Sequence, residues 1–246
     1  MMRRAIWILL MVSGLCVIAQ QDRRRAWKLP AGALVFFEFY SELGVTTNVT
    51  TVSAWGDQTG NGRNMIQTNS SFQPLIVTNQ LDGFPAIRFD GADNKLAIPQ
   101  FTYQSNGTIC AVIKLNTSGT TMPVWGGNII TANPSFAFYV LSSQKWSSQN
   151  GNSLDTVANA PLTVVFVAST YTSTPSVTNI IVQGATVLAT GNNGSNAWEL
   201  FSMGEDNNGA YGALDVFAVR AYNRVLGTNE IQAIHEQWQI KYPSLP

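Results

Sequence analysis

Charged residues are scarce in this chain of 246 residues, in which Asp, Glu, Lys and Arg together make up 11%. The formal charge is balanced, with 14 basic against 14 acidic residues. The five basic residues between positions 45 and 219 are spread along the chain: Arg63, Arg88, Lys95, Lys114 and Lys145. A groove that follows a phosphate backbone needs clustered cations, so a nucleic-acid partner is not expected. A surface built from Ser, Thr, Asn, Gln and Gly is typical of an extracellular β-protein.

Cysteine is also scarce. The chain has two, Cys16 and Cys110. Cys16 lies in the apolar run of residues 5–19, which follows two arginines and ends in a V-x-A pattern. This pattern predicts a cleaved secretion signal over residues 1–19, a leader segment over residues 20–31 and a domain over residues 32–246. The alternative is a retained membrane anchor, although a spanning helix needs about twenty apolar residues.

Removal of the signal leaves Cys110 as the remaining thiol, so no disulfide can form within the mature chain. Cys110 lies in TICAVIKL, where apolar residues recur as they do in a strand. We therefore expect a buried, inert thiol and a domain that is held together by packing alone.

Long helical patterns are lacking too, and the chain instead contains short apolar runs bounded by Gly, Asn, Ser or Pro. These runs predict strands over residues 33–40, 86–90, 108–115, 135–142, 162–169, 178–184, 198–204 and 213–222. Helical spacing occurs near the C-terminus, over residues 228–241. No helix alternates with the strands, which excludes a parallel α/β fold. The sequence predicts an all-β, antiparallel domain with one C-terminal α-helix.

Both ends of the domain resemble a known family. VSAWGDQTGNGRNMIQ and QPLIVTNQLDGFPAIRFDGADNKL, at residues 52–67 and 73–96, are similar to the opening of laminin-G-like or concanavalin A-like jelly-roll domains of microbial surface and phage proteins. The closing stretch GALDVFAVRAYNRVLGTNEIQAIHEQWQIKY resembles the last strand and helix of that family. The resemblance implies a jelly-roll sandwich of two antiparallel sheets. It does not imply one activity, because the fold serves lectins, adhesion modules, glycosidases, lyases and virion parts.

The loop at residues 55–64, WGDQTGNGRN, approaches a calcium-loop pattern, with Asp57, Asn61 and Gly62 in place. Thr59 and Thr68 occupy positions where that pattern needs oxygen-rich Asp, Asn or Glu. We therefore favour a turn that reverses the chain between strands.

A second oxygen-rich loop, MGEDNNGAYG, contains Glu205, Asp206, Asn207 and Asn208. Calcium takes six to eight oxygen ligands from such loops, so the loop is a candidate structural calcium site, with help from Asp57 or from Asp90 and Asp93, although a turn without a metal is favoured. The alternative is a hairpin turn without a metal.

Binding of sugars usually needs an exposed aromatic ring with amide or carboxylate groups beside it. The loop candidates are Trp146 with Gln144 and Asn150, together with Trp125 and Tyr211. We expect these side chains to be exposed, and Trp55 and Trp238 to lie in the core.

No pair of carboxylates has the spacing that a glycosidase needs on one strand. The only histidine, His235, falls within the helical pattern, where a solvated side chain is expected. We assign no catalytic residue. The sequence therefore predicts a secreted or cell-surface, non-enzymatic module that binds glycan or mediates adhesion. The alternatives are a structural or decoration protein of a virion or cell surface and, third, a glycoside hydrolase or polysaccharide lyase.

Overall fold

The computed structural model describes residues 35–99, 101, 104–129, 132–172, 174, 178–196, 198, 200–206 and 209–246. These residues belong to one compact unit, Ala33–Pro246. The expected signal and leader lie outside the described residues. Within the described part of the chain, no helix is both long enough and apolar enough to cross a membrane.

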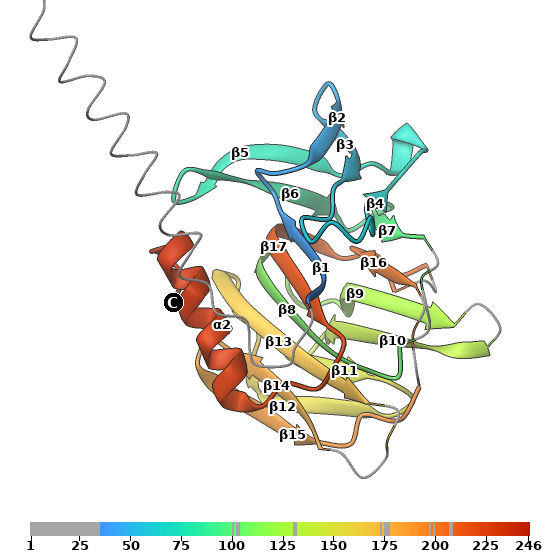
Figure 1. Ribbon diagram of the computed structural model, residues 1–246, viewed down its shortest axis with the longest axis vertical. Coiled ribbons are helices and arrows are strands. Elements are labelled where there is room, and N and C mark those ends of the chain that lie inside the picture. The colour runs from blue at the N-terminus through green and yellow to red at the C-terminus, as the bar shows by residue number, and fades with distance from the viewer. Residues whose placement is uncertain are drawn as a thin grey trace, which may run out of the picture. The chain divides into compact units, whose positions relative to one another are not determined.

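Strands make up most of the described chain, with one α-helix near its end (Figure 1). The strands are β1 (Val35–Tyr40), β2 (Val45–Asn48), β3 (Thr51–Trp55), β4 (Met65–Ile66), β5 (Leu75–Leu81), β6 (Phe84–Asp90), β7 (Leu96–Ile98), β8 (Asn106–Leu115), β9 (Met122–Ile129), β10 (Ala132–Val140), β11 (Lys145–Gln149), β12 (Ser153–Asn159), β13 (Val164–Thr172), β14 (Asn179–Gln183), β15 (Thr186–Gly191), β16 (Phe201–Met203) and β17 (Ala213–Tyr222). A 3-10 turn, η1, spans Ser70–Phe72, and the helix α2 spans Thr228–Lys241.

The strands pair antiparallel in two runs. The first, called the β8 half, follows the order β5, β6, β17, β8, β13, β14, β15, with β1 beside the C-terminal part of β17. The second, called the β10 half, follows β12, β11, β10, β9, β16, β7, β4, β3, β2. A bridge between Thr51 and Leu75 joins the halves. The result is one large antiparallel sheet that nearly closes into a barrel.

The central strands of the β8 half are buried on both faces. Ile109, Ala111 and Ile113 of β8 point into the core between the halves. On the other face, Phe166 of β13 packs against Trp238 of α2, with 5.6 Å between the ring centroids. Because the sheet is covered on both sides, these strands read as continuous apolar runs, which made them easy to recognise in the sequence.

Several expectations are confirmed. The helix has the predicted bounds, and each of the eight predicted strands overlaps an observed one. Trp55 and Trp238 are fully buried. Cys110 is buried as well, and burial raises the pKa of its thiol to about 12. An unreactive thiol follows.

The expectation of a solvated His235 is wrong. The side chain is buried against Phe166, and its Nε2 donates a hydrogen bond to the Pro246 carbonyl oxygen at 2.7 Å. The helical pattern predicted the helix itself, but residues 242–246 fold back over this part of α2. That return of the chain is a tertiary contact which the pattern does not contain.

Candidate functional site

Trp146 and Trp125 do not form an exposed sugar platform, which corrects the sequence expectation. Both are fully buried, and both stack on Phe138, at 5.3 Å and 4.4 Å between ring centroids. Trp146 Nε1 donates to Gln183 Oε1, and Trp125 Nε1 donates to Tyr171 Oη. Both rings therefore point inward from β9 and β11. Their faces contact other side chains of the protein and are not open to a sugar.

The polar residues around Trp146 do not form an exposed set either. Asn150 is fully buried, and its Nδ2 donates to the Thr172 carbonyl oxygen at 3.3 Å. Gln144 adopts a left-handed turn with φ of 62°, and its Nε2 is buried. The segment at residues 144–150, which was expected to bind sugar, therefore forms the turn after β10 and strand β11. Its central side chains lie in the interior.

The 55–64 loop is a turn organised by Asp57. The Asp57 carboxylate accepts hydrogen bonds from the backbone amides of Glu38, Thr59 and Arg63, at 3.0, 3.0 and 3.3 Å. Arg63 Nη1 in turn donates to the Phe36 carbonyl oxygen at 2.9 Å. The loop thus covers the edge of β1 that β17 leaves open, which is a common means of protecting a strand edge.

Glu205 and Asp206 are nearly buried, and protein donors contact both carboxylates. Lys95 Nζ lies 2.9 Å from Glu205 Oε1. Asp206 accepts from Tyr139 Oη at 2.9 Å and from the Ala210 amide at 3.1 Å. Burial, together with the neighbouring Asp206, raises the pKa of Tyr139 above its usual range.

The residues expected to bind calcium are only partly visible. Asn207 and Asn208 lie outside the described residues. Among the residues that are described, no group of three or more His, Cys, Asp or Glu side chains could hold a metal ion. The contacts of Asp57 and Glu205 with protein donors occupy those carboxylates, and calcium binding stays a prediction.

Of the three aromatic residues that were expected to bind sugar, Tyr211 is the one that is partly exposed. An antiparallel bridge pairs it with Glu205, which places the two side chains next to each other on one side. Gly126 of β9 makes this arrangement possible, because a Cβ there would lie 2.7 Å from the Asp206 Cα. The loop that carries both side chains therefore packs directly on β9 and β16.

The residues on the other side of Lys95 carry no recognisable pattern in the sequence. The Lys95 amide donates to the Phe72 carbonyl oxygen at 3.0 Å, which places η1 beside the start of β7. Ile66 pairs with Ala97 of the same strand. Phe72 is 36% exposed and Ile66 41% exposed. Contacts between loops far apart in the sequence bring these residues together.

We call this region the Lys95 surface and define it by its residues: Ile66, Phe72, Asp93, Lys95, Glu205, Asp206 and Tyr211. It combines two accessible aromatic rings with a partly exposed ion pair. Rings offer apolar stacking faces, and the charged groups offer donors and acceptors for hydroxyl groups. The arrangement suits an amphipathic ligand such as a sugar.

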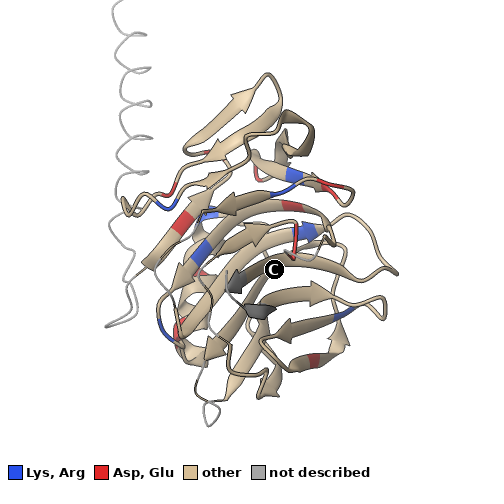
Figure 2. Ribbon diagram, turned by 90° about the vertical axis from the view of Figure 1, so that its right-hand side faces the viewer, with Lys and Arg blue, Asp and Glu red and all other residues tan. Residues whose placement is uncertain are grey.

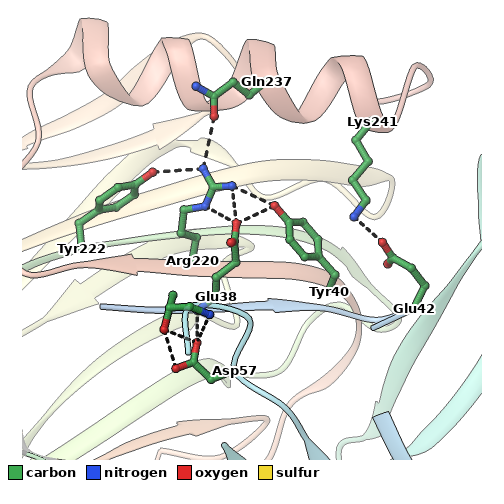
Figure 3. Close-up of polar contacts among 9 residues, drawn as sticks. Glu38, Tyr40, Glu42, Asp57, Arg220, Tyr222, Gln237 and Lys241 are labelled. Atoms are coloured by element: carbon green, nitrogen blue, oxygen red, sulfur yellow. Dashed lines mark hydrogen bonds and ion pairs between the residues drawn. The ribbon is translucent and has the colours of Figure 1, made fainter. Parts of the chain in front are cut away.

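A denser set of charged groups lies beneath α2 and was not recognised in the sequence (Figure 3). Arg220 is 1% exposed, and its Nε donates to Glu38 Oε1 at 2.7 Å. Its other nitrogens donate to the Tyr40 and Tyr222 hydroxyls at 2.9 Å and 3.2 Å, and to Gln237 Oε1 at 3.3 Å. Burial raises the pKa of Tyr222 to about 12. Because α2 covers these groups, they join β1, β17 and α2 rather than meet a ligand.

Beyond these two clusters, charged positions are few and scattered over a largely uncharged ribbon (Figure 2). Lys241, at the end of α2, pairs with Glu42 and lies over the Tyr40 ring at 3.4 Å from its centroid. Burial lowers the pKa of Lys241, although the Glu42 carboxylate opposes this effect. The Lys95 surface is therefore the best-supported candidate for ligand contact among the described residues.

Neither a protein-family model nor a curated protein matches the sequence. Solved structures do match the fold. Trypanosoma rangeli sialidase superposes with a TM-score of 0.61 and 13% identity, over 94% of this chain but 39% of the sialidase chain. The chain thus corresponds to about two fifths of that enzyme.

Two further structures have a similar fold. Domain 4 of AbnA, a GH43 extracellular arabinanase from Geobacillus stearothermophilus solved with arabinotriose, has a TM-score of 0.60 and 11% identity. The match covers 82% of this chain and 98% of that domain. The receptor-binding domain of botulinum neurotoxin D has a TM-score of 0.57 and 12% identity, over 83% and 52% of the two chains. Identities this low establish a shared fold, and the sialidase and arabinanase chains belong to carbohydrate-active proteins.

Proposed function

We propose that this protein is an exported, non-enzymatic module of the concanavalin A-like jelly-roll type that binds glycan or mediates adhesion. The observation that carries the proposal is the Lys95 surface. There, the partly buried Tyr211 is bridged through its backbone to Glu205, and the exposed Phe72 is hydrogen-bonded through its backbone to Lys95, the other member of the ion pair. A sugar ring would stack on an aromatic face while its hydroxyls bond to the charged groups.

The similar structures support a glycan partner in two ways. AbnA domain 4 is matched over nearly its whole length, and its structure contains arabinotriose. One of the Trypanosoma rangeli sialidase structures contains sialic acid. These sugars, one neutral and one acidic, are useful first probes. Secretion or display at a cell surface, or in a virion, would bring the module to such partners.

The state of the carboxylates favours binding over catalysis. Hydrolysis of a glycosidic bond ordinarily needs two carboxyl groups that flank an open space for the substrate. Glu205 and Asp206 are each 5% exposed and face Lys95 and Tyr139. A hydrolase or lyase remains a third candidate. Turnover of a polysaccharide that is abolished by Glu205→Gln or Asp206→Asn would support it.

A glycan array probed with the purified protein, with calcium and with EDTA, tests the proposal. We expect binding that Tyr211→Ala and Phe72→Ala each weaken by roughly fivefold to tenfold, because each removes one stacking ring. Ile240→Ala removes an apolar side chain that is 51% exposed on α2 and is the matched control. Loss of binding in EDTA would establish the calcium requirement. Absence of binding in both buffers would contradict the proposal.

The second candidate is a structural or decoration protein whose partner is another protein. Exposed apolar side chains concentrate between residues 49 and 75, with Val49, Ile66, Phe72 and Leu75 exposed by 96, 41, 36 and 41%. Accessible apolar groups of this kind are often covered by a protein partner. A stable, stoichiometric complex that forms without sugar and is lost in Leu75→Ser would favour this candidate.

A further inference from the structure

We propose that two copies of this protein pair through strand β2, so that an antiparallel sheet continues from one copy into the other around a twofold axis. The inference does not depend on glycan binding. It follows from three features of this part of the fold: an open strand edge, a neighbouring face without charges, and an apolar residue held in a strained turn.

One edge of β2 has no partner strand. β3 pairs with the other edge, and no further strand of the described residues pairs with β2, which lies at the rim of the ribbon (Figure 1). The last three residues of β2 are exposed. Amide and carbonyl groups along such an edge can pair with a strand of another chain. The open edge of β2 is therefore a place where a second sheet can be joined.

The other ends of the two runs of strands are protected in ways that β2 is not. A Cβ at Gly191 of β15 would lie 2.9 Å from Leu154 Cδ1 of β12, so these two outer strands cover each other. The register of β5 is irregular between Val77 and Leu81, which discourages further pairing there. β2 contains neither a proline nor a charged residue, which are common devices against strand addition. Strand addition is thus favoured at β2.

The side chains next to this edge form an uncharged face. Directly paired residues point to the same side of a sheet, so Asn48, Thr51 and Leu75 form one row, while the opposite side of β3 faces the core. Asp, Glu, Lys, Arg and His are absent from residues 43–56 and 64–81. A twofold dimer brings a surface against its own copy, where like charges would repel each other. A face without charges avoids this cost, which favours a second copy as the partner.

Val49, in the turn between β2 and β3, is 96% exposed and has φ of 60°. It is the first central residue of a two-residue hairpin turn, where a positive φ ordinarily calls for glycine. A β-branched side chain in this conformation is strained. Leu75, which pairs with Thr51 beside the turn, is 41% exposed. In the dimer the second copy would cover both apolar side chains, which gives the strained Val49 a role.

Analytical ultracentrifugation of the purified protein over a range of concentrations tests the proposal. We expect a reversible dimer with a dissociation constant of roughly 1–100 µM, because one short strand and two apolar side chains form a small interface. Val49→Gly should weaken the dimer by about tenfold, since it removes an apolar side chain from both copies. Val157→Ala removes an apolar side chain that is 86% exposed on β12, and this matched control should leave the dissociation constant unchanged.

Val49→Gly also separates loss of the interface from loss of the fold. Glycine adopts a positive φ without strain, and this gain offsets the greater freedom that glycine gives the unfolded chain. The melting temperature of the monomer should therefore stay close to that of the wild type.

Thr46→Lys provides a second variant, at an exposed position of β2. It brings like charges from the two copies together across the twofold axis. We expect a weaker dimer at low salt and partial recovery at about 0.5 M sodium chloride, because salt screens the repulsion.

A protein that stays monomeric up to several times the upper expected dissociation constant overturns the proposal, and so does a dimer that neither substitution weakens. Binding of a glycan or of another protein to this face of a monomer would have the same effect. Glycan binding without dimerisation contradicts this inference and leaves the proposed function standing. Dimerisation without glycan binding does the reverse.

Discussion

Arg220 and Arg224 each pair with a glutamate, but their surroundings differ. The Arg220 side chain is 2% exposed in its pair with Glu38, whereas the Arg224 and Glu230 side chains are 31% and 32% exposed. Breaking a buried pair leaves an uncompensated charge in a poorly solvated site, while an exposed pair is replaced by water. At the residue scale, burial thus decides what one contact contributes.

We therefore expect Arg220→Met to lower the free energy of unfolding by about 3–5 kcal/mol, because Glu38 would lose its cation under α2. Arg224→Met should cost about 1 kcal/mol or less. Urea denaturation followed by circular dichroism measures both. Equal losses in the two variants would contradict a structural role for the buried network.

His235 gives a pH-dependent prediction. Burial lowers its pKa, although the Pro246 carbonyl oxygen and Glu236 act in the opposite direction. The unfolded chain, with a pKa near 6.5, then binds a proton more readily than the folded one. The free energy of unfolding should therefore fall as the pH drops below about 6.5, until the lower folded pKa is passed.

His235→Gln should remove this part of the pH dependence, since glutamine does not titrate. Thermal unfolding between pH 7.5 and 5 compares the two proteins. Parallel pH profiles for the wild type and the variant would show that the imidazole does not contribute.

At the scale of elements, β1 depends on contacts from two sides. β17 pairs with one edge, and the 55–64 loop covers the other through Asp57, Asn61 and Arg63. The glycine-rich and asparagine-rich sequence of this loop permits the tight turn, with Gly60 and Gly62 at φ of 81° and 72°. The glycines, asparagines and Asp57 that resemble a calcium loop are therefore explained by the need to cover the open edge of β1.

Asp57→Ala should loosen this edge. The carboxylate accepts backbone amides of three residues, and a hydrogen bond to a charged group contributes about 1.5–3 kcal/mol. We expect a loss of about 2 kcal/mol and faster amide hydrogen exchange at Glu38 and Arg63. Glu236→Ala, at an exposed position of α2, is the control. Unchanged exchange at Glu38 would refute the role given to Asp57.

At the scale of the whole molecule, one core cluster extends between the β8 and β10 halves, and a second buried apolar layer, which includes Phe166 and Trp238, lies between β13 and α2. The described residues contain one cysteine, Cys110, and it is a free thiol. Packing between the two halves therefore supplies the stability that disulfides provide in many small secreted domains.

We accordingly expect one cooperative unfolding transition with the same midpoint by tryptophan fluorescence and by far-ultraviolet circular dichroism. A reducing agent should leave this midpoint unchanged. Two separate transitions would indicate that one half unfolds without the other.

The all-β class, the eight apolar strands and the bounds of α2 could be read from the sequence, because each depends on local periodicity. Most of the remaining strands were missed because they are short or polar, as in β12, where one of seven residues is buried, whereas β9 was missed because Pro123 and two glycines interrupt its apolar pattern. The same limitation explains the error about Trp146. Its neighbours are polar, but they belong to a hairpin whose inward face carries the ring.

The sequence by itself determined eight of the extended segments, the one segment that forms a helix, and the burial of Trp55 and Trp238. Only the tertiary structure decided the site. Lys95 and Glu205 are 110 residues apart, and Glu38 and Arg220 are 182 apart. Strand pairing and loop packing bring these charges together, and neither leaves a periodic signal in the chain. The physical reason is that periodicity reports the environment of a residue's own element, whereas a ligand surface depends on which elements become neighbours.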